Sequence, residues 1–311
     1  MKILLTAIGK RVELIKHLKT KFTVVGADCS ELNPARYFVD KFCLIPRVNE
    51  DDYIPSLLRI CKEEKIDCLI PLLENEFPIL DSARDEFKRN GTTLILSDGG
   101  ILDICKDKKK TSEFFEKYSI PSPISYKEEE YANQNALKFP VIVKPADGMG
   151  SANVFCCYDS EDLKHALKKV SNPIVQEKID GTEYTMDVLS DMSGNVIYAV
   201  ARERIEVING EVNKSRVVLD DGIIKLSKDV MEALNKEGSA VGPFTLQCFK
   251  TEDGSLCMLE INPRFGGGVP LSFAAGADYA GALSDILEGK KPEVNEIKEI
   301  TMLRYTESVF V

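Results

Sequence analysis

Met258-Leu259-Glu260-Ile261-Asn262-Pro263-Arg264-Phe265 reads as a β-strand that runs directly into three glycines, Gly266 to Gly268. A strand has a side-chain period of two, so Met258, Glu260 and Asn262 are predicted to share one face, while Leu259 and Ile261 share the other. One face of this strand is therefore expected to carry carboxylate and amide oxygens.

A second predicted strand, Phe244 to Phe249, precedes it, and Asp253-Gly254 is a favoured two-residue hairpin turn. A turn of that length places Gln247 opposite Glu260. An amide facing a carboxylate, with Asn262 two residues further on, suits a hard cation that keeps some ligand positions for water and phosphate.

The simpler alternative is a hairpin with a solvated polar face. The residues that follow favour a phosphate site instead: Pro263 fixes a turn, Arg264 is a permanent cation, and the glycines supply a flexible run of backbone N–H groups.

On these residues the sequence resembles the ATP-grasp superfamily, and within it the synthetase halves of the carbamoyl-phosphate synthase large chain and their short single-unit relatives. Glu260 to Arg264 matches the family's Glu-x-Asn-Pro-Arg strand, which implies Gln247, Glu260 and Asn262 as metal ligands and Arg264 as a catalytic residue. The resemblance implies an enzyme that uses ATP with Mg²⁺ or Mn²⁺ to convert a substrate carboxylate into an acyl phosphate. An amine then attacks it, giving an amide or peptide-like bond, ADP and phosphate.

The composition is that of a folded globular protein, with 44% apolar and 29% charged residues in 311. The net charge of −10 argues against nucleic acid or an anionic membrane as a partner. The nine cysteines show no zinc or C-x-x-C spacing and are expected to be structural thiols. No apolar run has the length of a signal-peptide core or a membrane span, so a cytoplasmic location is expected.

Alternating strands and helices over the first hundred residues predict a parallel sheet covered by helices. In such sheets ligands lie past the carboxyl ends of the strands, so the loops at 9–11, 28–30 and 74–76 are candidates for the co-substrate pocket, or are plain surface loops. The resemblance implies a pre-ATP-grasp domain whose loops help to form the substrate site. The predicted strands are 2–7, 22–27, 41–45, 67–71 and 93–96, and the predicted helices are 11–19, 54–64 and 77–89.

This opening invites a dinucleotide-binding interpretation, because Asp28 closes the second strand. The first loop, however, has Gly9 alone where the fingerprint needs three glycines. A nicotinamide site is therefore not expected.

A strand over residues 139–145 carries Lys144 near its end and runs into a glycine-containing loop. A lysine at that position can act as a point charge between phosphates, and the loop can close over them. The resemblance gives Lys144 a phosphate contact with a catalytic role, and makes Lys108 a further phosphate ligand. It also implies that the loop containing Gly148, Gly150 and Ser151 covers the bound nucleotide.

The predicted strand at residues 174–179 turns into another at 182–188. Extended backbone can read a purine edge, and a carboxylate after the turn can accept hydrogen bonds from ribose hydroxyls. The resemblance assigns the adenine to 176–179, with Glu177 and Ile179 as contacts, and the ribose to Glu183. An exposed strand residue is the alternative for Glu183.

A hairpin is predicted to turn at Asn209-Gly210 and carries four basic residues. With a two-residue turn, Glu203 faces Arg216 and Ile205 faces Lys214. The choice of which basic pair lines the active site stays open between Arg202 and Arg204 on one side and Lys214 and Arg216 on the other, with a cross-strand salt bridge as the alternative.

The whole chain is thus expected to be α/β: an N-terminal parallel-sheet domain at 1–100, a small α+β lobe with its linker helix at 101–175, and a large α+β lobe with the metal site at 176–311. Further helices are predicted at 229–241, 270–275 and 279–287, and a final strand at 300–311. Both histidines, His17 and His165, are predicted on helix surfaces.

The preferred function is a small carboxylate–amine ligase acting on small-molecule carboxylate and amine substrates. A nucleotide-binding regulatory module without turnover and a carbamoyl-phosphate synthase-like subunit are the alternatives. The oligomeric state is left open, with a homodimer as one alternative.

Overall fold

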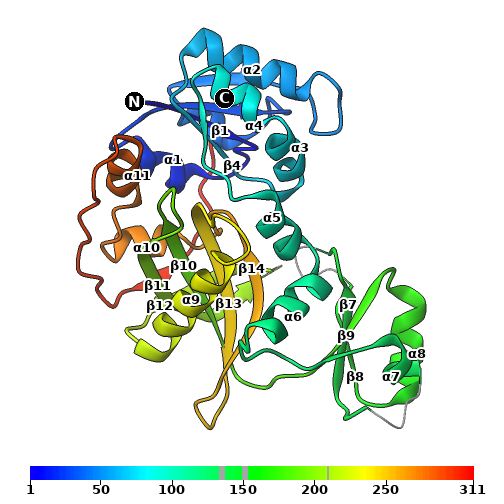
Figure 1. Cartoon of the computed structure of the whole chain (residues 1–311). Coiled ribbons are helices and arrows are strands. Elements are labelled where there is room, and N and C mark those ends of the chain that lie inside the picture. Colours follow the sequence, from blue (N-terminus) through cyan, green and yellow to red (C-terminus); the bar gives the residue numbers. More distant parts are fainter. Residues whose placement is uncertain (133–136, 149–152, 209) are drawn as a thin grey trace.

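The computed structural model describes residues 1–132, 137–148, 153–208 and 210–311. Within these residues the strands form three sheets, of five, four and six strands. Figure 1 shows them as three regions, with the five-stranded sheet at the top and the four-stranded sheet at the lower right. The predicted α/β architecture, a parallel-sheet domain followed by two α+β lobes, is confirmed.

The five-stranded sheet and its helices, called the N-terminal unit below, have the strand order β3-β2-β1-β4-β5, and every pair is parallel. Ile3 and Leu5 of β1 pack into one apolar cluster and Leu4 into another, because helices cover both faces of the sheet. The elements are β1 Lys2–Thr6, α1 Val12–Leu18, β2 Thr23–Asp28, η1 Pro34–Tyr37, β3 Lys41–Leu44, α2 Tyr53–Glu64, β4 Cys68–Pro71, η2 Glu74–Glu76, α3 Phe77–Ser82, α4 Arg84–Arg89 and β5 Thr93–Leu94.

The single helix predicted over 77–89 is wrong in one respect, since two short helices meet at Ala83, whose φ and ψ are −97° and 6°. The backbone there leaves the helical region for one residue, and each piece keeps its own buried contacts, Leu80 in α3 and Phe87 in α4.

The four-stranded sheet, called the small sheet, has the order β6-β9-β7-β8, and its pairs are antiparallel. Its core consists of Val141, Val143 and Val175 from the strands, with Leu163 and Ala166 from the covering helix α8. Two helices, α5 and α6, lead into it from the N-terminal unit, and α5 is not among the predicted elements. The bounds are α5 Gly99–Lys106, α6 Lys108–Lys117, β6 Ser125–Tyr126, α7 Glu128–Ala132, β7 Val141–Pro145, β8 Phe155–Cys157, α8 Ser160–Lys169 and β9 Pro173–Glu177.

The six-stranded sheet, called the large sheet, has the order β14-β13-β10-β11-β12-β15. Val230 and Leu234 of α9 pack with Phe244 and Leu246 of β13 in one buried cluster. The bounds are β10 Thr182–Ser190, β11 Val196–Ile208, β12 Glu211–Val217, α9 Asp221–Leu234, β13 Gly242–Lys250, β14 Leu256–Asn262, α10 Pro270–Ala274, α11 Tyr279–Leu287 and β15 Thr301–Leu303.

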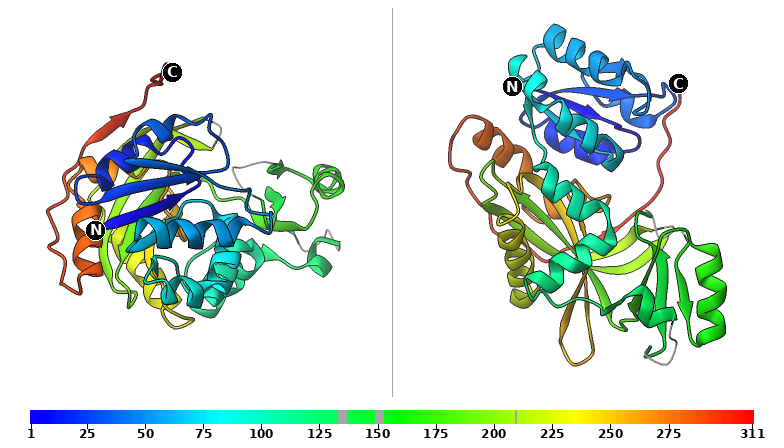
Figure 2. Two further views of the ribbon diagram at one scale, coloured as in Figure 1. Left: turned by 90° about the horizontal axis from the view of Figure 1, so that it is seen from above. Right: turned by 45° about the vertical axis from the view of Figure 1, so that its right-hand side comes forward.

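Two predicted elements of this region are wrong in their bounds. The helix predicted at 229–241 begins at Asp221, because the Asp220 side chain accepts a hydrogen bond from the Ile223 N–H and caps the helix there. The strand predicted at 300–311 is β15 alone, and the chain after it leaves the sheet and runs back to the N-terminal unit, so that both ends of the chain lie beside that unit (Figure 2).

A buried ion pair joins β10 and β11 in the large sheet. Arg202 Nε donates to Asp187 Oδ2 at 2.7 Å, and both side chains are almost fully buried. Asp187 also accepts from the Ser272 hydroxyl at 2.6 Å, and its backbone carbonyl accepts from the Tyr279 hydroxyl at 2.9 Å. This network ties α10 and α11 to the sheet.

The Arg202 guanidinium also packs against Gly268, in the loop that follows β14. A Cβ at Gly268 would lie 2.5 Å from Arg202 Nη1, so this position accepts no side chain without a shift of the buried arginine. The ion pair therefore restricts the path of the loop that follows β14.

We expect Arg202→Ala to lower the free energy of unfolding by about 3–5 kcal/mol, because Asp187 would stay buried without its cation. Urea unfolding followed by circular dichroism measures the change. Arg216→Ala is the matched control, because Arg216 lies on the neighbouring strand in an exposed pair with Glu203 at 2.6 Å. It should change stability little. Equal losses in the two variants would contradict a special role for the buried pair.

Candidate active site

The β13–β14 hairpin places Gln247 opposite Glu260, as predicted. Its turn is longer than predicted, because β13 ends at Lys250 and β14 begins at Leu256. The register shifts by one residue just beyond Gln247, which is a β-bulge. The bulge offsets the longer turn, and the predicted pair forms.

The same bulge changes the faces of two side chains. Met258 was predicted beside Glu260 but is fully buried in the core, in one cluster with Ile261. Leu259 was predicted on the core face but lines a cleft together with Glu260. The strict alternation predicted for this strand is therefore wrong before Glu260 and holds from Glu260 to Asn262.

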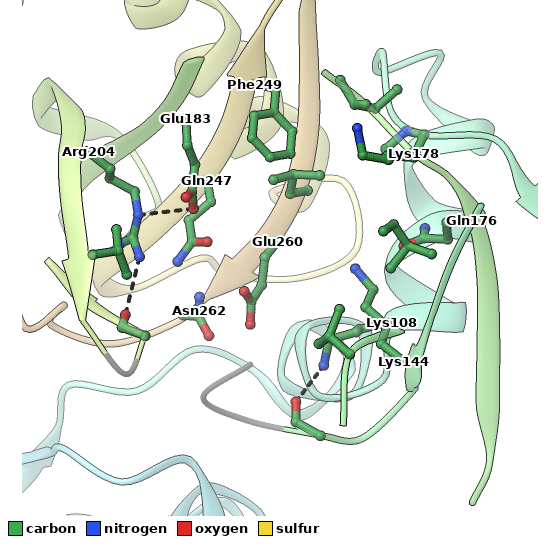
Figure 3. Close-up of a pocket in the computed structure, with 18 of the residues that line it drawn as sticks. Lys108, Lys144, Gln176, Lys178, Glu183, Arg204, Gln247, Phe249, Glu260 and Asn262 are labelled. Atoms are coloured by element: carbon green, nitrogen blue, oxygen red, sulfur yellow. Dashed lines mark hydrogen bonds and ion pairs between the residues drawn. The ribbon is translucent and has the colours of Figure 1, made fainter. Parts of the chain in front are cut away.

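This cleft has a volume of about 490 Å³ and lies between the small sheet and the large sheet. Figure 3 shows Lys108 and Lys144 on one side, and Gln247, Glu260 and Asn262 facing them. Every described residue that was predicted for the site lines this cleft. Gly150 and Ser151 lie outside the described residues. The predicted residues that line it are Lys108, Lys144, Gly148, Glu177, Ile179, Glu183, Gln247, Glu260, Asn262 and Arg264.

The Asn262 side chain lies within hydrogen-bonding distance of two carboxylates. With its amide nitrogen turned toward them, this side chain donates to Glu260 Oε1 at 3.3 Å and to Glu74 Oε1 at 3.1 Å. No cluster of three or more His, Cys, Asp or Glu side chains forms a metal site in the described chain. A cation here would be held by a mixture of carboxylate and amide oxygens, which are ligands that Mg²⁺ and Mn²⁺ accept.

Two lysines reach the cleft from the other side. Lys108, the first residue of α6, donates from Nζ to the Gly148 carbonyl at 2.5 Å, and its backbone N–H donates to the Ala146 carbonyl at 2.9 Å. Burial lowers the pKa of Lys144 on β7 to about 8, with Lys108 lowering it further and Glu260 opposing the shift. Lys144 is thus a cation held without full hydration.

Arg204 is the member of the four basic hairpin residues that lines the cleft. Its Nε lies 3.0 Å from Glu183 Oε1, and its Nη2 donates to the Gly210 carbonyl at 3.2 Å. Arg202 is buried against Asp187, and Lys214 and Arg216 form ion pairs with Glu206 and Glu203. Of the four basic residues between which the sequence leaves the choice open, Arg204 is therefore the one that lines the cleft.

The predicted pairing of that hairpin is correct at one position and wrong at another. Glu203 faces Arg216, as predicted, but Lys214 faces Glu206 rather than Ile205. A bulge between Arg204 and Val207 moves the register by one residue.

Part of the cleft lining is apolar and includes Ile142, Ile179, Phe249 and Leu259, which are together called the apolar wall. Phe249 and Leu259 are not among the predicted site residues. The period of two would have found Phe249, which lies two positions after Gln247 on the same strand face. Leu259 could not be found without the bulge.

The predicted adenine segment forms part of this wall. The backbone N–H of Glu177 donates to the Ile124 carbonyl at 2.9 Å, and that of Lys178 to the Pro140 carbonyl at 3.3 Å. These two donors are committed to neighbouring loops, and no hydrogen bond occupies the N–H of Ile179 within the described residues.

Of the three candidate loops of the N-terminal unit, the one at 74–76 contacts a residue that lines the cleft, Arg264. Glu74 Oε1 lies 2.8 Å from Arg264 Nε. Glu76 is turned inward instead, and accepts a hydrogen bond from the Tyr53 hydroxyl at 2.7 Å. Burial raises the pKa of Glu76 to about 7. In the loop at 28–30, Asp28 accepts from the Gly9 N–H at 3.0 Å, and this ties together the other two loops.

His17 is not on the surface, which corrects the prediction. Its ring stacks on Phe273 with 3.8 Å between centroids, and Nε2 accepts a hydrogen bond from the Ala280 N–H at 3.1 Å. Burial lowers its pKa. His165 is exposed on α8, as predicted. The cleft is lined by neither histidine.

Two protein-family models match the chain. Residues 3–95 match the PylC-like N-terminal domain, and residues 105–268 match the ATP-grasp domain. The carbamoyl phosphate synthase large chain of Archaeoglobus fulgidus is 28% identical over 292 residues, which are 87% of this chain and 26% of that protein. The D-alanine–D-alanine ligase of Fusobacterium nucleatum is 27% identical over 166 residues, 51% of this chain and 56% of that protein.

The chain therefore spans about a quarter of the carbamoyl phosphate synthase large chain and just over half of the D-alanine–D-alanine ligase. Among solved structures, the biotin carboxylase domain dimer of the Hydrogenobacter thermophilus 2-oxoglutarate carboxylase, in complex with MgADP, ADP and bicarbonate, superposes with a TM-score of 0.76 at 17% identity. The match covers 95% of this chain and 72% of that chain. Because the matching model spans more than half of its residues, this chain belongs to the ATP-grasp family.

Proposed function

We propose that the chain is an ATP-dependent, ADP-forming ligase that joins a substrate carboxylate to an amine. The observation that carries this proposal is the cleft in which Glu260 and Asn262 of the large sheet face Lys108 of α6 and Lys144 of the small sheet. The names of the relatives support it, since a carbamoyl phosphate synthase and a D-alanine–D-alanine ligase are both among them.

The nucleotide is proposed to lie along the whole cleft. Among its described lining residues five are basic and three acidic, although the chain as a whole has a net charge of −10, so the cleft attracts an anion. The apolar wall suits a flat base, and the lysines suit phosphates. Glu183, which pairs with Arg204 at the edge of the cleft, is proposed to accept hydrogen bonds from the ribose hydroxyls.

The residues fit a divalent cation, with Glu260 as the carboxylate ligand and Asn262 and Gln247 as amide ligands. Mg²⁺ or Mn²⁺ bound there would neutralise phosphate charge during transfer. The likeness to a structure in complex with MgADP supports this choice.

The proposed reaction has two steps. A carboxylate oxygen of the substrate attacks the γ-phosphorus of ATP, the bond to the β–γ bridging oxygen breaks, and ADP leaves. An amine nitrogen then attacks the acyl carbon, phosphate leaves, and the nitrogen loses a proton. Lys144 and Arg264 hold the charge that develops on the transferring group, which is a task of positioning and electrostatics and needs no imidazole base.

Two other functions remain as alternatives. A regulatory module would bind ATP without turnover, but an intact set of Lys144, Glu260, Asn262 and Arg264 favours catalysis. A carbamoyl phosphate synthase-like activity is the other alternative, because the chain is similar to about a quarter of such a large chain. ADP release across a panel of carboxylates and amines separates the ligase from the module, which would bind ATP tightly and release no ADP with any pair.

The substrates are proposed to be small molecules. The proposed assembly is a homodimer, because the structurally similar biotin carboxylase domain of Hydrogenobacter thermophilus is a dimer. Sedimentation of the purified chain tests the dimer.

We expect Glu260→Gln to lower substrate-dependent ADP release at least about 100-fold, because the variant loses the carboxylate that faces the phosphate site. A coupled ADP assay measures it, and Mn²⁺ binding in the presence of ADP gives an independent readout. Glu252→Gln, an exposed residue in the turn of the same hairpin, is the control and should keep wild-type activity. Unchanged turnover in Glu260→Gln would refute the proposed site.

We expect the affinity for ATP to fall as pH rises above about 8, the pKa of Lys144. Above this value the lysine of the free protein is neutral, and binding must take up a proton, so the dissociation constant should rise about tenfold for each further pH unit. Titration of ATP binding between pH 7.5 and 9.5 measures this.

Lys144→Arg keeps its charge over that whole range and should show nearly constant affinity. If this variant loses affinity with pH as steeply as the wild type, another group is responsible for the effect.

A further inference from the structure

Three arginines from distant parts of the chain gather around Gly267. Arg11 precedes α1 in the N-terminal unit, Arg264 follows β14, and Arg304 follows β15. Arg304 Nη2 donates to the Gly267 carbonyl, and Arg11 Nη1 lies 3.7 Å from the position that a Cβ of Gly267 would take. The group therefore borders the glycine loop on the side facing the N-terminal unit.

Two of these arginines have partners. Arg264 pairs with Glu74 at 2.8 Å. Arg304 Nη1 donates to the Val212 carbonyl at 3.2 Å and lies 3.5 Å from Glu211 Oε2. The hydrogen bonds of Arg304 hold the loop against β12, so its place in the group is fixed.

Arg11 is different. Its guanidinium makes no hydrogen bond or ion pair with any residue that the structure describes, although it is half-buried. Burial lowers the pKa of Arg11 to about 10, Arg264 and Arg304 lower it further, and Glu211 opposes them. The Glu211 side chain is 64% exposed, so it neutralises the positive charge of the three arginines only in part.

The Arg11 guanidinium is thus partly dehydrated, has two cationic neighbours and forms no ion pair with the described residues, which makes it a candidate site for an external anion. The absence of a side chain at Gly267 leaves the guanidinium free on that side. Arg264 connects this group to the proposed reaction, because it also lines the nucleotide cleft.

We propose that Arg11 binds a second anionic group, a carboxylate or a phosphate, on the substrate whose reacting carboxylate lies at Arg264. This inference rests on the proposed ligase function and names its substrate class: an acid with a further, non-reacting anionic group. Planar arginine contacts to such oxygens are bidentate and depend on geometry as well as charge.

Binding to the full chain with MgADP present tests the inference. The probes are dicarboxylates from malonate to adipate, each compared with its monoamide, and 3-phosphonopropionate, which distinguishes a phosphate from a carboxylate preference. The proteins are the wild type, Arg11→Gln, Arg11→Lys and, as the matched control, Lys10→Gln, which removes an exposed charge from the adjacent residue.

For at least one chain length, the wild type should bind the doubly anionic probe about 10- to 100-fold more tightly than the singly anionic one. Arg11→Gln should abolish this preference while still binding ADP, Arg11→Lys should keep part of it, and Lys10→Gln should behave as the wild type. If Arg11→Gln fails to fold, Gly267→Ala replaces it, and should weaken binding of the same doubly anionic probe.

Absence of any preference in the wild type, or a preference that survives in Arg11→Gln, overturns the inference. Trapping of the acyl phosphate by hydroxylamine, with ATP in place of ADP, keeps the two proposals apart. Hydroxamate formed equally from singly and doubly anionic acids leaves the ligase standing and removes the Arg11 site. Selective binding without hydroxamate from any probe leaves the Arg11 site standing and counts against the ligase.

Discussion

The register of one hairpin governs which side chains meet in the cleft. Strands β13 and β14 are hydrogen-bonded so that Gln247 and Glu260 are cross-strand neighbours, and the bulge beside them turns Leu259 into the cleft and Met258 into the core.

 A slip of one residue would exchange these faces, since the side-chain period of a strand is two. The position of the carboxylate opposite Lys144 therefore depends on backbone pairing before it depends on any side-chain contact.

Behind this hairpin, the buried pair of Asp187 and Arg202 performs a different task. It joins the large sheet to α10 through Ser272, and its guanidinium fills the space below Gly268. The backbone of the glycine loop cannot pack closer to the core, because the Arg202 guanidinium occupies the space beside Gly268. The loop therefore remains near the surface of the large sheet, in contact with Arg304 and close to Arg11 of the N-terminal unit.

Much of this architecture could be predicted from local sequence, and the parts that could not share a physical cause. Strand β1 is an almost continuous apolar run and could be predicted, whereas the predicted Gln247–Glu260 pair forms only because the bulge offsets a turn longer than the predicted one. Bulges escape such reasoning, because a bulge changes the face of a residue such as Leu259 without changing its type. Helix bounds failed where a cap decided them, as with Asp220 at α9.

Contacts between distant segments were also beyond local reasoning. The loops at 9–11 and 74–76 were candidate loops, but nothing in their sequence indicates that Glu74 meets Arg264, or that Arg11 approaches Gly267. The choice of Arg204 among four basic residues likewise depended on a partner, Asp187, that removes Arg202 from consideration. The roles of all these residues in binding and catalysis stay predictions.

The low pKa of Lys144 has a chemical consequence outside its role as a cation. A lysine with a pKa of about 8 is largely an uncharged amine in mildly alkaline solution, where ordinary lysines remain protonated. An uncharged amine is a nucleophile, so this side chain is intrinsically the more reactive toward acylating and aldehyde reagents. If a nucleotide occupies the cleft as proposed, an analogue that carries such a group would come close to Lys144 and should label it covalently in preference to the exposed lysines of the surface.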